Sequence, residues 1–422
     1  MTEKTNPDIM EKIATEAKSA AEKTGVLDSP AKNRALRAIA SEILKKKDEI
    51  FRENGKDTAE AEKKKMAPAL IDRLVIDGKR VEAMVRGLEE VAELEDPVGK
   101  VAAFGKKRPN GLAVEKMRIP LGVIGIVYES RPNVTVDAAA LCLKSGNSVI
   151  LRGGSEALHS NVVLGQIIRG CLSEMKIPPG AVNVIPDTDR KLVLQMLKMD
   201  GLIDLIIPRG GQSLIEFVVK NSTIPVLKHY KGICHVFVDE SAKIPMAVNI
   251  CVNSKVQRPG VCNAMETMLV HEKIAPVFLP AVCAELGKSG VALKGCPETA
   301  ALIPGAEAAR EADWETEHLA LVLNVKVVKD IHGAMAHIRK YGSMHTDSIV
   351  TEDEANANLF LRGVESSAVI HNASTRFNDG FELGMGAEIG ISTTKIHAFG
   401  PMGLEELTSE KFLVKGKGQV KE

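Results

Sequence analysis

The chain has 422 residues, 45% hydrophobic and 26% charged, as expected for a soluble globular protein of about two to four domains. Lys and Arg together number 55 and so do Asp and Glu, so no bulk charge is available to hold a nucleic acid or an anionic membrane. Aromatic residues make up only 3%, which argues against stacking platforms for single strands or sugars, and no apolar run approaches the roughly 18 residues of a membrane span.

The seven cysteines contain no CxxC pair. A disulfide framework or a structural zinc site is therefore not expected. Instead, we expect a cytoplasmic protein with reduced thiols.

The N-terminal segment, up to about residue 95, is predicted to be helical. Ser29-Pro30 indicates a capping residue followed by proline at the first helical position, and apolar residues then recur at helical spacing from Leu36 to Leu44. Asn54-Gly55 is expected to end this pattern. A second amphipathic helix is predicted over residues 81–91.

Short mixed segments follow between Pro97 and Pro120, where glycine and proline are frequent. Asn110-Gly111 is typical of a two-residue hairpin turn, so we expect a β-hairpin that projects from the body of the protein. Near the C-terminus, residues 412–414 form a short apolar strand candidate.

Apolar strands and helices alternate from Val123 onward. Strands are predicted at 123–128, 148–151, 181–185, 203–207 and 233–238, and helices at 136–143, 157–175, 191–199 and 213–220. This alternation indicates βαβ units and a parallel sheet covered on both faces, which binds ligands at the C-terminal ends of its strands. A second α/β stretch follows, with helices predicted at 246–256 and 275–286 and strands at 265–270, 321–328, 349–350 and 368–370.

Cys262 is the best candidate for a nucleophile. It lies in Gln-Arg-Pro-Gly-Val-Cys-Asn, residues 257–263, where Pro-Gly forces a turn that can present the thiol. The charge of Arg258 favours the reactive thiolate. The alternative for Cys262 is a small buried hydrophobic residue, and that is what we expect of the other six cysteines.

Two glycine pairs, Gly153-Gly154 and Gly210-Gly211, each follow a predicted strand. Missing side chains there would let the backbone approach a nucleotide closely, although such pairs also occur simply as turns. No GxGxxG fingerprint, GxSxG elbow or Walker loop is present. His332, His337 and His345 are spaced irregularly and lack an HExxH arrangement, so no metal site is predicted.

Several motifs resemble those of the aldehyde dehydrogenase superfamily and occur in its order. They are Arg-Pro-Asn at 131–133, residues 146–154, Pro-Arg-Gly-Gly at 208–211 and residues 257–263. Further motifs, His-Thr-Asp at 345–347, residues 372–380 and residues 400–405, are similar to those of the γ-glutamyl phosphate reductases, also called glutamate-5-semialdehyde dehydrogenases. The resemblance extends from about Ser29 to Lys411.

The resemblance implies an α/β fold, aldehyde dehydrogenase-like, with two parallel-sheet domains and a small β oligomerisation element. It places a cofactor-binding domain at 1–96 and 119–245, a catalytic domain at 246–390, and the oligomerisation hairpin with a C-terminal strand at 97–118 and 391–422.

The activity that it implies is the NADPH-dependent reduction of L-glutamate 5-phosphate to L-glutamate 5-semialdehyde, a step of proline biosynthesis, by a homo-oligomer. The length leaves no room for a fused kinase domain, and functional coupling to a separate glutamate 5-kinase is a further hypothesis.

The resemblance also assigns catalytic roles. Cys262 would attack the acyl phosphate and expel phosphate, which leaves a thioacyl enzyme, while the Asn133 amide and the Cys262 backbone N–H would hold the oxyanion. In oxidising relatives a glutamate in a Glu-Leu-Gly-Gly-Lys run activates water, whereas this chain has His229 at the start of the corresponding run. Loss of that carboxylate suits a reductase that must avoid hydrolysis.

Binding roles follow in the same way. Arg152 takes the position beside the adenine ribose, where a planar cation suits the 2′-phosphate of NADPH. The remaining cofactor candidates are Gly153, Gly154, Pro208, Gly210, Gly211 and, at the nicotinamide ribose, Glu317. Candidates for the substrate are Arg131 and Arg376 at its carboxylate and Asp379 at its ammonium group.

One departure from the family pattern is Phe399, which stands where the family usually has arginine. Two alternatives stay open: a hydrolytic or CoA-acylating aldehyde dehydrogenase, and a non-catalytic protein that has kept the fold.

Overall fold

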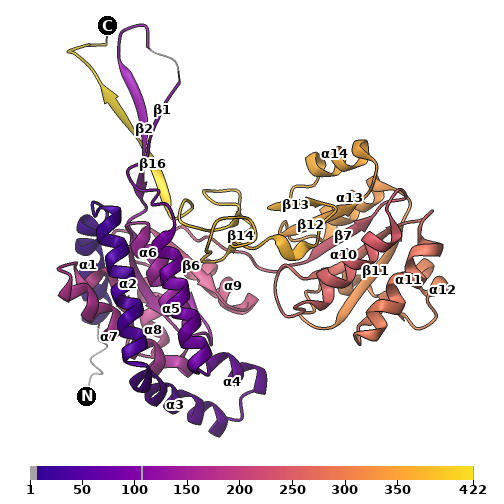
Figure 1. Ribbon diagram of the computed structural model, residues 1–422, viewed down its shortest axis with the longest axis horizontal. Coiled ribbons are helices and arrows are strands. Elements are labelled where there is room, and N and C mark those ends of the chain that lie inside the picture. Colours follow the sequence, from indigo (N-terminus) through magenta and orange to yellow (C-terminus); the bar gives the residue numbers. More distant parts are fainter. Residues whose placement is uncertain (1–6, 106–107, 422) are drawn as a thin grey trace. The chain divides into compact units, whose positions relative to one another are not determined.

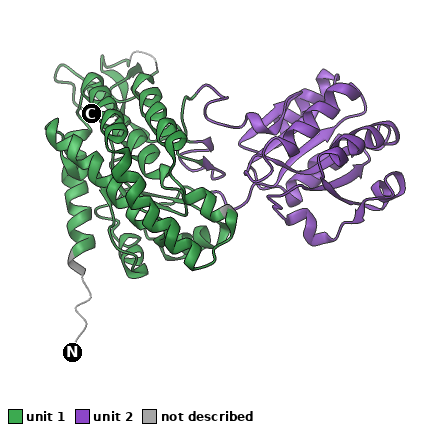
Figure 2. Ribbon diagram, turned by 60° about the horizontal axis from the view of Figure 1, so that its bottom comes forward, with its two compact units in different colours: residues 1–228, 385–390, 402–422 green, residues 229–384, 391–401 purple. Residues whose placement is uncertain are grey.

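The computed structural model describes residues 7–105 and 108–421, which form two compact units (Figure 2). Unit 1 comprises residues 1–228, 385–390 and 402–422, and unit 2 comprises residues 229–384 and 391–401. Each unit contains a parallel sheet with helices packed against it, as predicted.

Unit 1 contains a four-stranded parallel sheet in the order β5-β4-β3-β6 (Figure 1). Its strands are β3 (Val123–Tyr128), β4 (Ser148–Arg152), β5 (Val182–Val184) and β6 (Leu205–Arg209). The chain builds outward from β3 to β5 and then returns to place β6 on the other side of β3. The strand order therefore reverses between β3 and β6, which is where sheets of this kind bind ligands.

The helices of unit 1 pack around this sheet. They are α1 (Pro7–Thr24), α2 (Ser29–Lys45), α3 (Lys47–Lys63), α4 (Pro68–Leu74), α5 (Gly78–Glu93), α6 (Asn133–Lys144), α7 (Leu158–Glu174), α8 (Arg190–Met196) and α9 (Gln212–Asn221), with short 3₁₀ turns at Ser155–Ala157 and Pro179–Ala181. Met10 of α1 packs with Val123 and Val127 in one core cluster, whereas Ile124 and Ile126 point to the opposite face because side chains alternate along a strand.

Two predictions for the N-terminal helices were wrong in detail. The cap of α2 is Asp28, whose Oδ1 accepts a hydrogen bond from the Ala31 backbone at 2.7 Å, so Ser29 already lies inside the helix. Asn54-Gly55 does not end a helix, because α3 runs through it. The Asn54 side chain is buried and donates to the carbonyl of Leu74, and this tertiary contact outweighs the usual tendency of Asn-Gly to break a helix.

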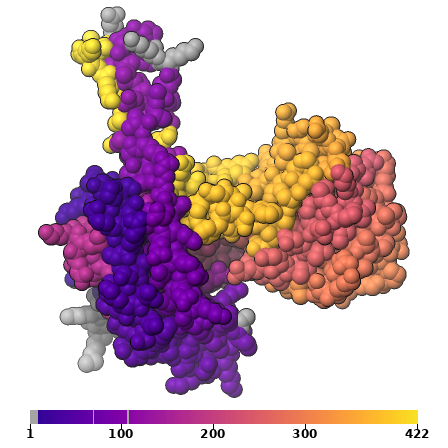
Figure 3. Space-filling model, in the orientation of Figure 1, coloured from indigo at the N-terminus to yellow at the C-terminus, as the bar shows by residue number. Residues whose placement is uncertain are grey.

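A small antiparallel sheet extends from the helical part of unit 1 (Figures 1 and 3). It consists of β1 (Val101–Ala103), β2 (Ala113–Pro120) and β16 (Thr408–Lys415), with β2 in the middle. The predicted two-residue turn at Asn110-Gly111 was wrong, because nine residues, 104–112, connect β1 to β2. Part of that connection lies outside the described residues. The C-terminal strand pairs with β2 along all eight of its residues, from Thr408 to Lys415.

Unit 2 contains a seven-stranded parallel sheet in the order β10-β9-β11-β8-β7-β12-β13. Its strands are β7 (Cys234–Val238), β8 (Met265–His271), β9 (Ala292–Gly295), β10 (Glu307–Ala308), β11 (Val322–Val328), β12 (Thr346–Val350) and β13 (Ala368–His371). The strand predicted at 233–238 therefore does not close the first sheet, since β7 pairs with β8 and β12. Its apolar pattern is the same in either sheet, so local sequence could not reveal its partners.

Helices cover both faces of this second sheet. They are α10 (Ile244–Val256), α11 (Ala275–Lys288), α12 (Pro297–Leu302), α13 (Ile331–Tyr341) and α14 (Glu354–Gly363), with 3₁₀ turns at Glu311–Glu315 and Thr375–Phe377 and a two-stranded ribbon of β14 (Ile391–Ser392) and β15 (Gly400–Pro401). Val236 and Met268 pack with α10 and α11 on one face, and Phe237 and Leu269 pack with α13 and α14 on the other. None of the helices in the described part of the chain has the length and hydropathy needed to cross a bilayer.

Candidate active site

Cys262 lies in the irregular turn between α10 and β8 of unit 2. It is half-buried, whereas the other six cysteines are all buried. Its carbonyl accepts a hydrogen bond from the Cys234 thiol at 3.1 Å. Proline and glycine in residues 257–263 thus present this thiol as predicted, and Cys262 is the one cysteine that a substrate could reach without unfolding the core.

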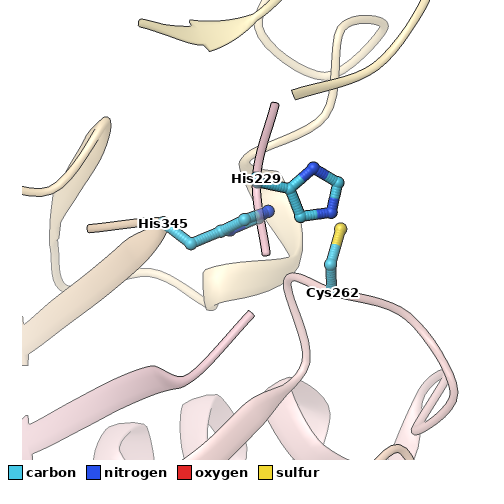
Figure 4. A group of neighbouring side chains, drawn as sticks. All are labelled: His229, Cys262 and His345. Carbon is cyan, nitrogen blue, oxygen red and sulfur yellow. The ribbon is translucent and has the colours of Figure 1, made fainter. Parts of the chain in front are cut away.

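Two histidines from distant parts of unit 2 lie beside this thiol. His229 and His345 each have a ring nitrogen that, with the Cys262 sulfur, forms a group whose atoms lie within 4.8 Å of one another. Figure 4 shows the sulfur beside the His229 ring, with the His345 ring pointing toward both. The two rings meet edge to face, with their centroids 5.6 Å apart.

Hydrogen bonds hold both imidazole rings through Nδ1. His229 Nδ1 lies 2.9 Å from the carbonyl oxygen of Ile391, to which it donates. His345 Nδ1 lies 2.7 Å from Thr346 Oγ1. In each ring the second nitrogen, Nε2, therefore lies on the side away from that bond. His229 is half-buried and His345 is fully buried.

Hydrogen bonds of the motif at 345–347 connect the segments that surround His345. Asp347 accepts hydrogen bonds from the backbone and the ring of His235, at 2.9 and 2.8 Å. Thr346 Oγ1 accepts a hydrogen bond of 2.8 Å from Asn378. The motif thereby links β12 to β7 and to the segment after the 3₁₀ turn at 375–377, and these contacts position His345.

Glu317 contacts the backbone of Gly232, the residue that packs against Cys262. Its Oε1 accepts a 2.9 Å hydrogen bond from the Gly232 N–H, and burial raises the pKa of the carboxyl group. Gly232 packs so closely against Cys262 that a Cβ there would lie 2.0 Å from the Cys262 carbonyl oxygen. Glu317 therefore fixes the segment that supports the thiol, and its predicted contact with a ribose stays a prediction.

A positive charge lies close to the thiol. Burial lowers the pKa of the Arg376 guanidinium, the charge of Arg258 lowers it further, and interactions with Asp379 and with Cys262 act in the opposite direction. Arg376 Nε donates to Gln257 at 2.9 Å. The structure thus brings Arg376 and Asp379 to the neighbourhood of Cys262, and their binding of substrate stays a prediction.

Asn133 and Arg131 lie in unit 1, where β3 leads into α6. The amide of Asn133, the first residue of α6, donates to Asp137 Oδ2 at 3.0 Å, one helical turn further along. Burial raises the pKa of Asp137 to about 6. Asp137 therefore orients the amide that the sequence assigns to the oxyanion, while Arg131 occupies the turn just before the helix.

The candidate cofactor residues Arg152, Gly153 and Gly154 lie at the C-terminal end of β4. Arg152 donates to the carbonyls of Gly153 and Thr188, at 2.7 and 3.0 Å, and its buried Nε has no hydrogen-bond partner among the described residues. A Cβ on Gly153 or Gly154 would lie 2.1 or 2.0 Å from atoms of the protein's own side chains. Packing against the buried Asn161 and Tyr128 therefore disfavours a side chain at Gly153, whereas the clash at Gly154 involves only the flexible end of Glu156.

Pro208, Gly210 and Gly211 lie at the end of β6, just before α9. The Gly211 N–H donates to the carboxylate of Glu129 at 2.9 Å, and a Cβ on Gly210 would lie 2.5 Å from the same carboxylate. An anionic group of Glu129 thus already lies at the N-terminus of α9. A pyrophosphate would have to displace it.

Sequence reasoning missed the contributions of His229, His345 and Asp137. Asp137 could have been found, because an Asn and an Asp four residues apart on a helix are neighbours. His229 and His345 are 116 residues apart, and no local spacing indicates that they meet at Cys262.

Phe399, the departure from the family pattern, lies with its ring 5.9 Å from Lys395 Nζ.

Comparison with known proteins gives a consistent result. A family model described as "Aldehyde dehydrogenase family" matches residues 2–310. A γ-glutamyl phosphate reductase of Desulfatibacillum aliphaticivorans is 54% identical over 98% of this chain and 99% of its own length. The crystal structure of a γ-glutamyl phosphate reductase from Thermotoga maritima superimposes with a TM-score of 0.96, at 46% identity, over 98% of this chain and 100% of that one.

A more distant structure has the same fold. It is an engineered glycolyl-CoA reductase with bound NADP+, which aligns with a TM-score of 0.67 at 16% identity and covers 96% of each chain.

Proposed function

The chain belongs to the aldehyde dehydrogenase family, as a γ-glutamyl phosphate reductase, and we propose that it reduces L-glutamate 5-phosphate to L-glutamate 5-semialdehyde with NADPH, through a thioacyl intermediate on Cys262. This reaction releases phosphate and is a step of proline biosynthesis. The single observation that supports the proposed mechanism best is that Cys262 is half-buried while the other six cysteines are buried.

The reaction begins at the thiol. The Cys262 sulfur attacks the acyl carbon, the bond from that carbon to the phosphate oxygen breaks, and phosphate leaves. The amide of Asn133 and the Cys262 N–H donate to the developing oxyanion, and one such donor is typically worth about 3 kcal/mol of barrier. Reduction of the thioester gives a thiohemiacetal, in which the carbon–sulfur bond breaks to release the aldehyde. Asp137 holds the Asn133 amide in place.

The reducing cofactor, when bound, supplies a hydride for this reduction. We assign it to the ends of β4 and β6, with Arg152 at the 2′-phosphate, Gly153, Gly154, Pro208, Gly210 and Gly211 along the nucleotide, and Glu317 at the nicotinamide ribose. The buried Nε of Arg152 has no hydrogen-bond partner among the described residues, and the guanidinium interacts with the charges of Glu156 and Arg190. A guanidinium with an unused N–H suits a phosphate better than a neutral hydroxyl. The guanidinium of Arg152 is the feature that supports NADPH rather than NADH.

The substrate is anionic at its carboxylate and cationic at its ammonium group. We assign the carboxylate to Arg131 and Arg376 and the ammonium group to Asp379. Support comes from the electrostatic interactions of Arg376 with Asp379 and with Cys262. The Arg376 guanidinium also attracts the phosphate of the substrate and so favours its approach to the thiol.

We further propose that β1, β2 and β16 form the oligomerisation element of a homo-oligomer. The sheet carries exposed Phe104 and Phe412, whose rings pack edge to face with centroids 5.0 Å apart, and its outer strands each have an unpaired edge within the described chain. Such a sheet is prone to pair with another chain. We also propose a cytoplasmic location, which the seven free cysteines support. Functional coupling to a glutamate 5-kinase is a further part of the proposal.

The reaction is tested in reverse. Glutamate semialdehyde, phosphate and NADP+ should produce NADPH absorbance only when all three are present, and Cys262→Ala should abolish it while Cys296→Ala, a matched change at a buried cysteine, should not. Activity that persisted in Cys262→Ala would refute the thioacyl mechanism. Replacement of phosphate by CoA or by water, with undiminished NADPH production, would instead identify an acylating or hydrolytic aldehyde dehydrogenase.

A further inference from the structure

His229, His345 and Cys262 have the composition and the support of a metal site. Their ligand atoms lie within 4.8 Å of one another. A tetrahedral Zn²⁺, with bonds of about 2.1 Å to nitrogen and 2.3 Å to sulfur, holds two nitrogens and one sulfur roughly 3.4 to 3.6 Å apart. A contraction on the order of 1 Å would therefore form the site.

The hydrogen bonds around the two rings match those of histidines that bind metals. A ligating histidine typically donates its other ring N–H to an oxygen, which fixes the orientation of the ring. His229 Nδ1 donates to the Ile391 carbonyl, while His345 Nδ1 lies 2.7 Å from Thr346 Oγ1 and 3.7 Å from the Cys234 sulfur, and it matches the pattern in the tautomer that donates to Thr346. Both rings thus present Nε2 as the coordinating atom, and Figure 4 shows the two rings and the thiol directed toward one another.

Burial of the three groups indicates which of them can move. His345 is fully buried and held by Thr346, so it forms the fixed ligand. Cys262 and His229 are half-buried, so these two side chains have more freedom to move toward the ion than His345 has. Their partial exposure also gives an ion access from solvent. With three protein ligands, the fourth position is left for water, as in open zinc sites.

We propose that Cys262, His229 and His345 bind Zn²⁺, and that the bound ion masks the nucleophile and reversibly inhibits the enzyme. Binding replaces the thiol proton with a sulfur–zinc bond and releases the proton to solvent. One thiolate and two imidazoles select Zn²⁺ or Cd²⁺ over Mg²⁺ or Ca²⁺, which prefer oxygen. The positive charge of Arg376 disfavours a cation, so we expect weaker binding than at a structural zinc site. Inhibition rests on the proposed role of Cys262, whereas metal binding does not.

Metal binding is measured on the full-length protein, stripped with EDTA and kept reduced with a phosphine. Titration with Zn²⁺ against a chromogenic indicator should reveal a single equivalent per chain. Loss of a residue that only hydrogen-bonds to a metal ligand typically weakens metal binding about 10- to 100-fold. Loss of a ligand itself, in His229→Gln, His345→Gln or Cys262→Ser, should therefore weaken Zn²⁺ binding at least tenfold. His332→Gln, at an exposed histidine, is the matched control and should bind as the wild type does. Unchanged affinity in His229→Gln would overturn the site, even if His345→Gln failed to fold.

Alkylation gives a readout that needs no enzymatic activity. Zn²⁺ should slow the carboxamidomethylation of Cys262, followed by mass spectrometry, at least tenfold in the wild type and in His332→Gln. His229→Gln should lose most of this protection. Full protection in His229→Gln would mean that the thiol binds the metal without the histidines, which would refute the proposal.

The activity assay separates this inference from the proposed function. Zn²⁺ should inhibit NADPH formation, and EDTA should restore it. An active enzyme that did not bind Zn²⁺ would refute the metal site and leave the reductase standing. A protein that bound Zn²⁺ but showed no reductase activity would refute the proposed function, and Zn²⁺ binding without inhibition of an active enzyme would refute the masking of the nucleophile.

Discussion

Gly232 packs directly against Cys262, the proposed nucleophile, and replacement of this glycine by alanine tests whether that packing positions the thiol. An added Cβ would lie 2.0 Å from the Cys262 carbonyl oxygen and 2.7 Å from its Cα, whereas real Cβ contacts stay beyond 3.0 Å. The atoms in the way are backbone, which cannot rotate aside as a flexible side chain can. The turn that carries Cys262 must therefore move by about 1 Å, and a misplacement of that size can cost about 100-fold in rate.

The expected result for Gly232→Ala is a fall of about 100-fold in kcat/KM, because the thiol no longer lies at the angle that the substrate requires. Overpacking should also reduce the free energy of unfolding by about 1 to 3 kcal/mol. The assay is NADPH formation from glutamate semialdehyde, phosphate and NADP+, combined with denaturant unfolding to show that the variant is folded at the assay temperature.

The matched control is Gly260→Ala in the turn that leads to Cys262. The nearest atom to a Cβ there is the Leu319 carbonyl oxygen, at an ordinary 3.8 Å. We expect Gly260→Ala to retain activity within about threefold of the wild type, since no atom has to move. Equal activities for the two variants would refute the reasoning, because they would show that close packing under Cys262 does not set the position of the thiol.

Three further changes test the electrostatics. Burial raises the pKa of the Asp137 carboxyl group from 3.8 to about 6, so the folded protein binds the proton of this group more tightly than the unfolded chain does. Protonation of Asp137 therefore stabilises the fold fully below pH 3.8, and this stabilisation is lost as the pH rises through 6. In urea unfolding, the free energy of unfolding of Asp137→Asn relative to the wild type should therefore rise by roughly 3 kcal/mol from pH 4 to pH 7. The variant holds the Asn133 amide more weakly, so its kcat should also fall. A stability difference between variant and wild type that stayed constant with pH would contradict this reasoning. Lys255→Met removes the ion-pair partner of the fully buried Glu266 and should lower the free energy of unfolding by about 3 to 5 kcal/mol at pH 8.5. The loss should be smaller below pH 7, because burial raises the pKa of Glu266 to about 7 and the carboxyl group is then neutral. Glu129→Gln removes a negative charge from the N-terminus of α9 and should lower the KM for NADPH about two- to fivefold, and a higher KM would show that this carboxylate helps to hold the cofactor.

Local sequence predicted most of the secondary structure because helices and strands have different apolar periodicities. The strand Val123–Tyr128 and the helix around residues 246–256 were found in this way. The same local signals were wrong where a tertiary contact competes with them. Asn54-Gly55 lies within α3 because buried hydrogen bonds satisfy the Asn54 side chain there.

What the sequence by itself determined about the site was its chemistry. Proline and glycine before Cys262 indicated a presented thiol, and glycines after buried strands indicated the ends of a parallel sheet. Those features depend on a few consecutive residues, so they can be recognised without knowing what lies opposite them in space.

Only the tertiary structure decided which residues meet. The strand that contains Cys234 has the same apolar pattern whichever sheet it joins, and hydrogen bonding to β8 and β12 places it in unit 2. His229, Cys262 and His345 come from three separate segments, and their encounter depends on the pairing of those strands and on the Ile391 carbonyl that orients one of the rings. The spacing of residues along the chain carries no information about such contacts, because the intervening segments can be folded in many ways that leave the same local pattern intact.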